Sequence, residues 1–329
     1  MHTEEMSSPE DMSYEDNGSN NSELIDILTQ ESSSFDQDDN EIWGDDFKFI
    51  DLNHKEFDNG LKLKCDIFSL EFPFFLLSKG KLPDPETKII DCEDLDFEWN
   101  SISDGDYSKS IKAVASARYG MPTIYDKNIL VFVTSCIVHL KNIAKKNKER
   151  FNVRKIRFLA GQFFKVFKKS DGGESYKRIL LGLKRLRHTA YETNVKQKNF
   201  QIFDDFQFFE NIRIVKVENK YCYIEVTISE WLFDAINKNQ ILTLHPDYTD
   251  LPPIQKRIYE VARKHCGNQT SVEIGIDKFQ KKLNVSSGKE FRRNINNPDT
   301  KIPEYVCEIE NKHMVKISQK DPNKILKGV

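Results

Sequence analysis

The sequence lacks the residue patterns of several common enzyme and metal sites. Its six cysteines include no CxxC pair, and no two of its seven histidines lie within a few residues of each other, which argues against zinc and against a histidine-bound metal. No GxxxxGK(S/T) phosphate loop is present, which argues against an ATPase or a helicase. We therefore expect no enzymatic activity, with no catalytic residue, no metal and no cofactor.

Long apolar stretches and a secretion signal are also missing. The longest apolar run, residues 129–140, is shorter than the roughly 20 residues that a membrane-spanning helix requires, and it contains Thr134, Ser135 and His139. The N-terminus is acidic and has no apolar core segment, unlike a signal peptide. Scattered cysteines are typical of a reducing compartment. These absences predict a cytoplasmic protein that does not bind a membrane.

The charge of the chain is strongly segregated, although the formal net charge is only −3. Residues 1–46 contain fifteen Asp and Glu and no Lys or Arg, a composition that predicts a disordered acidic tail. The rest of the chain has 49 basic and 37 acidic residues. Within it, residues 141–198 carry eighteen Lys and Arg against four Asp and Glu, a concentration of positive charge that is typical of nucleic-acid binding.

The segment 170–189 has the clearest pattern in the chain. A turn signal, Asp171-Gly172-Gly173, precedes a helical repeat of apolar residues that share one face, and the opposite arc is basic. A basic helix after a short helix and a Gly-containing turn matches the recognition helix of a helix-turn-helix, which enters the DNA major groove. We expect Arg178 and Arg185 to reach base edges there. The alternative is a solvated basic face on an ordinary surface helix. The predicted DNA-binding residues of this region are Tyr176, Lys177, Arg178, Lys184, Arg185, His188, Lys196 and Lys198.

The elements around this helix follow the order of a winged helix. A helix is predicted from Thr123 as N-cap, with Asp126 in the capping-box position, to about Lys146. A strand over residues 155–158, a helix over 159–169, the basic helix and a pair of strands within 190–228 follow. The apolar run 70–77 is expected in the core or at a contact between chains.

The second half of the chain repeats this order. A helix over 254–266 is predicted to expose Lys256, Arg257, Arg263 and Lys264. A strand over 271–276, a helix over 277–283, a second recognition-type helix over 289–297 and a hairpin within 302–317 complete the repeat. The predicted DNA-binding residues of this half are Lys289, Arg292, Arg293 and Asn296.

The sequence therefore predicts an α+β fold of tandem winged-helix (helix-turn-helix) domains. The predicted boundaries are a disordered acidic tail over 1–46, a first winged-helix domain with N-terminal strands over 47–228, and a second over 229–329. Phenylalanines at positions 200, 203, 206, 208 and 209 are interpreted as packing residues, with base stacking as the alternative.

Four stretches resemble the replication initiator protein A family of bacterial plasmid initiators. They are YGMPTIYDKNIL from Tyr119, GGESYKRILLGLKRLRHTAYETN from Gly172, ILTLHPDYTDLPPIQKRIYEVARKHCG from Ile241 and EFRRNI from Glu290. The resemblance implies a plasmid-associated protein of the bacterial cytoplasm that binds origin repeats in double-stranded DNA. It also implies recruitment of host replication proteins (initiator and helicase), autorepression and copy control, and a homodimer in equilibrium with the monomer. The alternative is a winged-helix transcriptional repressor without an initiation role.

Overall fold

The computed structural model describes residues 60–77, 96–101, 108–170, 172–196, 203–217, 220–297, 301–311 and 313–321. The chain divides between Phe47 and Lys48, and every described residue belongs to the second part. The predicted acidic tail, residues 1–46, lies outside the described residues.

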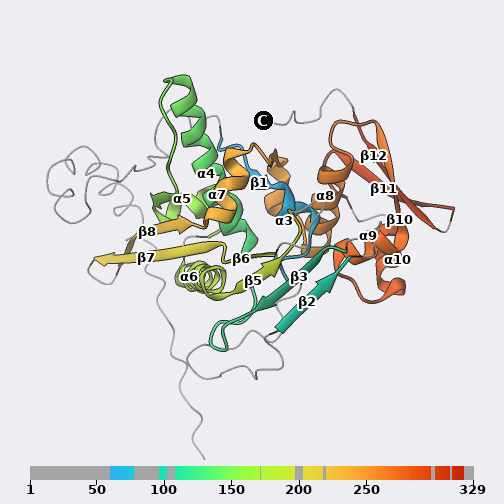
Figure 1. Cartoon of the computed structure of the whole chain (residues 1–329), viewed down its shortest axis with the longest axis horizontal. Helices are drawn as coiled ribbons and strands as arrows, with labels where there is room; N and C mark the ends of the chain where they lie inside the picture. Colours follow the sequence, from blue (N-terminus) through green and yellow to red (C-terminus); the bar gives the residue numbers. More distant parts are fainter. Residues whose placement is uncertain are drawn as a thin grey trace, which may run out of the picture. The chain divides into compact units, whose positions relative to one another are not determined.

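The first half of this second part contains six elements in the predicted order (Figure 1). They are α4 (Lys127–Lys146), β4 (Lys155–Phe158), α5 (Ala160–Val166), α6 (Gly173–His188), β7 (Phe209–Val217) and β8 (Lys220–Ile228). The three strands form an antiparallel sheet in the order β4-β8-β7, so the last strand of the set lies between the other two.

The second half repeats both the order and the strand topology. Its elements are α8 (Pro253–His265), β10 (Ser271–Gly275), α9 (Ile276–Leu283), α10 (Gly288–Asn296), β11 (Tyr305–Glu310) and β12 (Met314–Gln319). The antiparallel sheet order is β10-β12-β11, which again places the last strand between the other two. The predicted repetition of helix, strand, two helices and hairpin is therefore confirmed, and the fold is a mixture of helices and strands.

Further strands surround these two repeats. A four-stranded sheet, in the order β2-β3-β5-β6, joins β2 (Asp96–Asn100), β3 (Ser110–Val114), β5 (Ala190–Thr193) and β6 (Asp204–Phe206). A short strand β1 (Lys64–Asp66), followed by α3 (Ile67–Glu71), pairs with β9 (Ile241–Thr243) in register Cys65↔Leu242. The remaining helices are α7 (Glu230–Asn237) and the 3-10 helix η3 (Pro246–Asp250). The β1–β9 pair crosses the domain boundary that the sequence predicts at residue 228.

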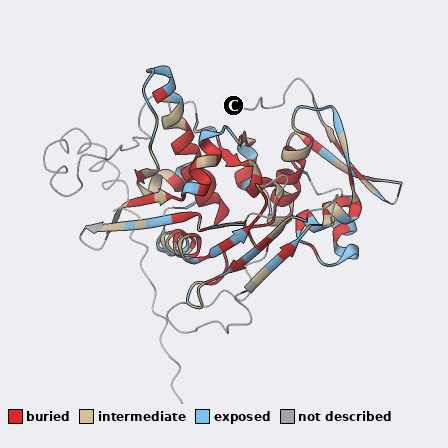
Figure 2. Ribbon diagram, viewed as in Figure 1, coloured by how far each residue is buried: buried red, intermediate tan, exposed pale blue. Residues whose placement is uncertain are grey.

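Helix α4 is the central helix of the core, as its apolar sequence predicts. Every residue from Lys127 to Val138 is buried, and Figure 2 shows the helix buried along most of its length. The described helices include none that is long and apolar enough to cross a membrane. Helix α4 begins at Lys127, so the prediction of Thr123 as its N-cap is wrong. The Asp126 carboxylate does accept a hydrogen bond from the backbone N of Thr123 (2.7 Å), the contact that its predicted capping-box position implies, and a second one from Thr123 Oγ1 (2.9 Å).

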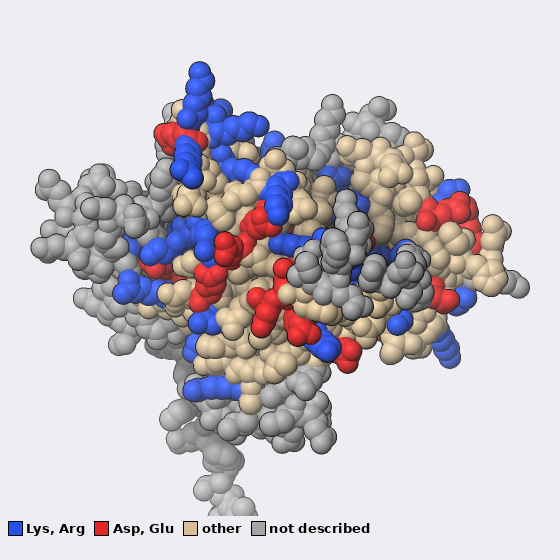
Figure 3. Space-filling view, viewed as in Figure 1, with Lys and Arg blue, Asp and Glu red and all other residues tan. Residues whose placement is uncertain are grey.

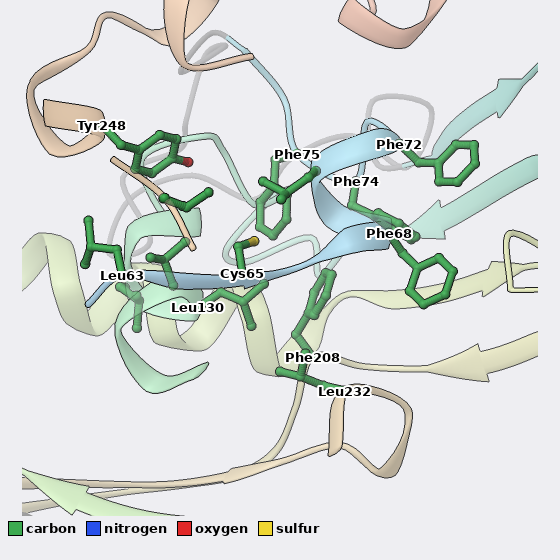
Figure 4. Packing of buried hydrophobic residues seen from close by; sticks show 14 of the residues in the cluster. Leu63, Cys65, Phe68, Phe72, Phe74, Phe75, Leu130, Phe208, Leu232 and Tyr248 are labelled. Carbon is green, nitrogen blue, oxygen red and sulfur yellow. The ribbon is translucent and has the colours of Figure 1, made fainter. Parts of the chain in front are cut away.

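The apolar run 70–77 supplies the centre of an aromatic cluster. Phe74 is fully buried and contacts the rings of Tyr191, Phe208 and Trp231 at centroid distances of 5.5, 5.7 and 5.8 Å. Figure 4 shows Phe74, Phe75 and Phe208 in the same hydrophobic core cluster as Leu130 and Cys65. Phe206, Phe208 and Phe209 are buried, which confirms the packing interpretation for these three. Phe203 is 46% exposed, and Phe200 lies outside the described residues.

Candidate nucleic-acid interface

Helix α6 lies against α4 through its apolar face. Ile179, Leu183 and Leu186 are buried, and a glycine brings the two helices unusually close. A Cβ atom at Gly182 would lie 2.6 Å from Ile129 Cδ1 and 2.7 Å from Asp126 Oδ1. The close approach fixes which residues of α6 face solvent.

Three of the predicted DNA-binding residues on α6 are exposed to solvent, and one of them, His188, ends the helix. Lys177 and Arg178 are exposed in the first half of the helix. Lys177 has a weak, solvent-exposed ion pair with Glu174 (3.7 Å, both side chains 74% exposed), and such a pair contributes little stability. Both cations are therefore available to an anionic ligand.

Arg185 is not presented to solvent, and the prediction that it reads a base is wrong for this structure. The residue is 6% exposed, and its Nε and Nη2 donate to the two oxygens of Asp126 at 2.8 and 2.7 Å. The reason is that Arg185 adjoins the apolar face of α6, beside Gly182, where the close approach of α4 brings in the Asp126 carboxylate. A bidentate arginine–carboxylate pair here joins α6 to the start of α4.

Two other predicted residues of this region, Tyr176 and Lys196, contact other parts of the protein. Tyr176 is half-buried and packs edge-on against Phe164 at 5.0 Å. Lys196 Nζ donates to the carbonyl of Trp231 at 2.6 Å and lies 4.1 Å from the centre of its ring, so it joins the segment after β5 to α7 rather than facing a ligand. Lys198 lies outside the described residues.

The last two turns of α6 lie beside a tyrosine ring that is surrounded by basic side chains, an arrangement that the sequence analysis did not predict. Lys184 Nζ lies 5.2 Å from the ring centre of Tyr119, and the His188 ring lies 5.4 Å from it. Arg118 lies against the same ring at 5.8 Å. We call Arg118, Tyr119, Lys184 and His188 the Tyr119 cluster. The adjacent Arg-Tyr pair before Gly120 is the sequence signal for it, but nothing in the sequence places that pair beside α6.

Helix α10 presents all four of its predicted residues. Phe291 and Ile295 are buried, with Phe291 edge-on to Phe279 at 6.0 Å. Ser287 caps the helix by accepting a hydrogen bond from the backbone N of Glu290 (3.3 Å). The opposite arc is exposed, and none of the described carboxylates pairs with its basic side chains. The exposed residues are Lys289, Arg292, Arg293 and Asn296.

Helix α8 departs from the sequence prediction, because Lys256, Arg257 and Arg263 are buried instead of exposed. Arg257 donates to the backbone carbonyls of Leu70 and Lys282, at 2.8 and 2.7 Å. Arg263 donates to the Thr243 carbonyl at 2.9 Å and to the Tyr305 hydroxyl at 3.0 Å. The basic arc of α8 thus faces other elements and cannot face DNA. The half-buried Lys264 pairs with Glu71 at 3.3 Å.

One buried carboxylate on α8 pairs with two of the buried cations around it. Glu260, fully buried, lies 2.8 Å from Lys127 Nζ and 2.9 Å from Arg257 Nη1. Burial alone would raise the pKa of Glu260, but the two cations hold it below its ordinary value. Lys256 donates to Asn128 Oδ1 at 2.8 Å, and burial lowers its pKa to about 7.

One surface region is unsuited to nucleic acid. Figure 3 shows acidic side chains gathered near the middle of one face, over α7 and β6. They line a hollow of about 930 Å³ whose acidic residues are Asp204, Asp205, Glu210, Glu230 and Asp234. Phosphate groups would be repelled there, so DNA is expected elsewhere. Among the described residues, no group of three or more His, Cys, Asp or Glu is arranged to hold a metal ion.

Residues 66–307 match the family model described as Replication initiator protein A. The chain belongs to the replication initiator protein A family. A protein of Wigglesworthia glossinidia brevipalpis, named as a candidate replication protein, is 30% identical over 239 residues, which are 70% of this chain and 78% of that protein. Both α6 and α10 lie within the range that the family model matches.

Two solved structures of RctB are also similar to the chain. One, of its domains 2 and 3, covers 73% of this chain and 95% of that chain at 13% identity, with a TM-score of 0.49. The other, of the same two domains, covers 71% and 95% at 11% identity, with a TM-score of 0.45.

Proposed function

We propose that this member of the initiator family starts plasmid replication by binding repeated sites in double-stranded DNA, with α6 and α10 as the two recognition helices. The observation that carries the proposal is the repetition of one arrangement. Helix, strand, helix, basic helix and hairpin occur twice, and both sheets have the same strand order. We interpret the two repeats as tandem winged-helix domains, each built on a helix-turn-helix.

The side chains on α10 fit the recognition of bases. Arg292 and Arg293 can each present a bidentate fork to guanine, and Asn296 can do the same for adenine. On α6, Lys177 and Arg178 occupy the first half of the helix, the part that contacts base edges in a helix-turn-helix. With Arg185 in the core, we assign base contacts on this helix to Arg178.

The wider roles in this proposal rest on membership of the family. The chain would recruit the host initiator and helicase, repress its own promoter and so set plasmid copy number, and exchange between homodimer and monomer in the bacterial cytoplasm. It would do this without catalysing a reaction. A transcriptional repressor without an initiation role would use the same two helices, and the binding site distinguishes it.

Footprinting of the full-length chain on the DNA upstream of its own gene tests the proposal. Directly repeated protected sites, about two helical turns apart, are expected of an initiator. A single inverted repeat would favour the repressor, because two-fold symmetric sites match a dimer. The absence of any protected site would refute sequence-specific DNA binding.

A paired substitution tests the part assigned to α10. Replacing Arg292 and Arg293 with alanine should shorten the footprint at one end and weaken specific binding by about 1–3 kcal/mol for each guanine that is no longer bound. Lys238→Ala is the matched control, because Lys238 is exposed beside the acidic hollow and pairs with Asp234 (2.9 Å). An unchanged footprint with unchanged affinity would remove α10 from the interface.

A further inference from the structure

The Tyr119 cluster begins in a turn that is fixed by its own hydrogen bonds. The backbone N atoms of Tyr119 and Gly120 donate to the Ser116 carbonyl at 3.1 and 2.8 Å, and the Arg118 N lies 3.3 Å from Ser116 Oγ. Gly120 has a φ of +74°, in the left-handed region that favours glycine. The turn therefore holds Arg118 and Tyr119 in one place, beside Lys184 and His188, which lie more than sixty positions further along the chain.

The cluster collects positive charge around a single aromatic ring. Lys184 and Arg118 lie 5.2 and 5.8 Å from the Tyr119 centroid, within the range of cation–π attraction. His188 follows Lys184 by four residues, so both belong to the same face of α6, and its ring lies 5.4 Å from that of Tyr119. The Tyr119 ring thus brings together three nitrogen-bearing side chains, of which Lys184 and Arg118 carry charges that repel each other.

Arg118, Lys184 and His188 have no carboxylate partner among the residues that the structure describes. Other basic residues of the described chain do have one: Arg185 pairs with Asp126, Arg154 with Glu210 and Lys112 with Glu192. Burial, followed by the charges of Arg187 and Lys184, lowers the pKa of His188 below its ordinary value. Near neutral pH the His188 imidazole is therefore neutral and can donate an N–H to an anion, while Lys184 and Arg118 supply the positive charge.

We propose that Arg118, Lys184 and His188, arranged by Tyr119, form a binding site for a phosphodiester of the DNA backbone beside α6. The proposal rests on the DNA-binding function above and adds residues from outside the two recognition helices. Arginine and lysine are the usual donors to phosphate, and phosphate contacts fix the position of a protein on the duplex without reading its sequence. The cluster would anchor the second half of α6 while Arg178 in the first half reads bases.

A structural role for the same charges makes a different prediction. Cations in the last turn of a helix interact favourably with its dipole, and α6 ends in Arg185, Arg187 and His188. This role would make His188, and to a lesser extent Lys184 just before the last turn, contribute to stability alone. It does not extend to Arg118, which belongs to the Ser116–Gly120 turn and not to the helix. Arg118 is therefore the residue that distinguishes a phosphate site from a helix cap.

The test measures binding of the full-length chain to random and origin duplex over a range of salt concentrations. Arg118→Ala should weaken binding to both duplexes equally, by roughly fivefold to tenfold near 0.1 M salt, and lower the salt-dependence slope by about 0.9, as expected when one phosphate is no longer neutralised. Arg118→Lys should restore most of the slope, whereas Lys238→Ala should change nothing. Unfolding midpoints of all variants should stay at the wild-type value.

Several results would overturn the proposal. Unchanged affinity and slope in Arg118→Ala, while the paired Arg292/Arg293 substitution weakens binding, would keep the DNA function and remove the cluster from it. A loss confined to origin duplex would show that Arg118 reads a base and does not hold a phosphate. A second arm measures the thermal shift given by inorganic phosphate at constant ionic strength. A shift that depends on Arg118, without an effect on duplex binding, would assign the site to free phosphate. Failure of the wild-type chain to bind any duplex would refute the proposed function itself.

Discussion

Replacing Arg185 with alanine should lower the stability of the protein without removing a side chain that binds DNA. The guanidinium and the Asp126 carboxylate share two hydrogen bonds, of 2.7 and 2.8 Å, and their side chains are only 8% and 5% exposed. Alanine at position 185 leaves the carboxylate buried without its counter-ion. The substitution therefore acts on the junction between α4 and α6.

The size of the effect follows from what remains around Asp126. Breaking a buried ion pair by removing one partner costs about 3–5 kcal/mol, because the other charge stays buried and uncompensated. Asp126 keeps the two hydrogen bonds from Thr123, at 2.7 and 2.9 Å. We therefore expect the lower end of this range, about 3 kcal/mol in the free energy of unfolding.

Urea unfolding of the full-length chain measures this loss as a lower midpoint at an unchanged slope. Arg178→Ala is the control, because an exposed side chain on the same helix should change stability by no more than about 0.5 kcal/mol. The double variant Asp126→Asn with Arg185→Met, which removes both charges, should recover most of the loss. If Arg185→Ala keeps the wild-type midpoint but loses affinity for origin DNA, the reasoning is refuted and Arg185 leaves the core to bind DNA.

Two further substitutions test the packing of the core. Gly182→Ala should destabilise the chain by about 1–3 kcal/mol, although alanine is the better helix former by about 1 kcal/mol. The reason is that the alanine Cβ would lie 2.7 Å from Asp126 Oδ1, an atom that is hydrogen-bonded to Arg185. An unfolding midpoint at or above the wild-type value would contradict this. Lys256 has a pKa of about 7 in the folded chain, whereas its ordinary value is 10.5. Between these two pH values the unfolded chain therefore binds more protons than the folded chain, and the free energy of unfolding should rise with pH. Lys256→Met should flatten this rise, measured as the difference in unfolding free energy between pH 7 and pH 9.5, and an equally steep rise in the variant would assign the titration to another group.

Periodicity in the sequence was sufficient to find the helices and their apolar faces. Helices α6, α8, α9 and α10 begin and end within three residues of their predicted bounds, because buried positions at three- and four-residue spacing define a face independently of what covers it. The exposed arc of α10 is also as predicted. Among the described residues, no other element covers that arc, so the polar face that the sequence predicts for α10 is exposed to solvent in the structure.

The same periodicity could not tell a solvated polar arc from one that packs against a second polar surface. Arg257 on α8 and Arg185 on α6 lie on basic arcs, yet both are buried because carboxylates and carbonyls from distant segments meet them. The Tyr119 cluster was missed for the same reason, since a turn and a helix far apart in sequence come together only in the fold. Pairings such as Lys64↔Thr243 depend on contacts between residues that no local pattern connects.

The hydrogen bonds of Arg257 have a consequence for how the chain can be divided. This side chain, in the second repeat, holds carbonyls at Leu70 and Glu71, before the first repeat begins, and at Lys282, near the end of α9. A fragment that stops at residue 228 would leave α3 without α8, and β1 without its partner strand β9. A fragment that starts at residue 229 would contain Arg257 without the Leu70 and Glu71 carbonyls, and Glu260 without Lys127. The two halves should therefore melt in one calorimetric transition, and separately expressed halves should be proteolysed rapidly.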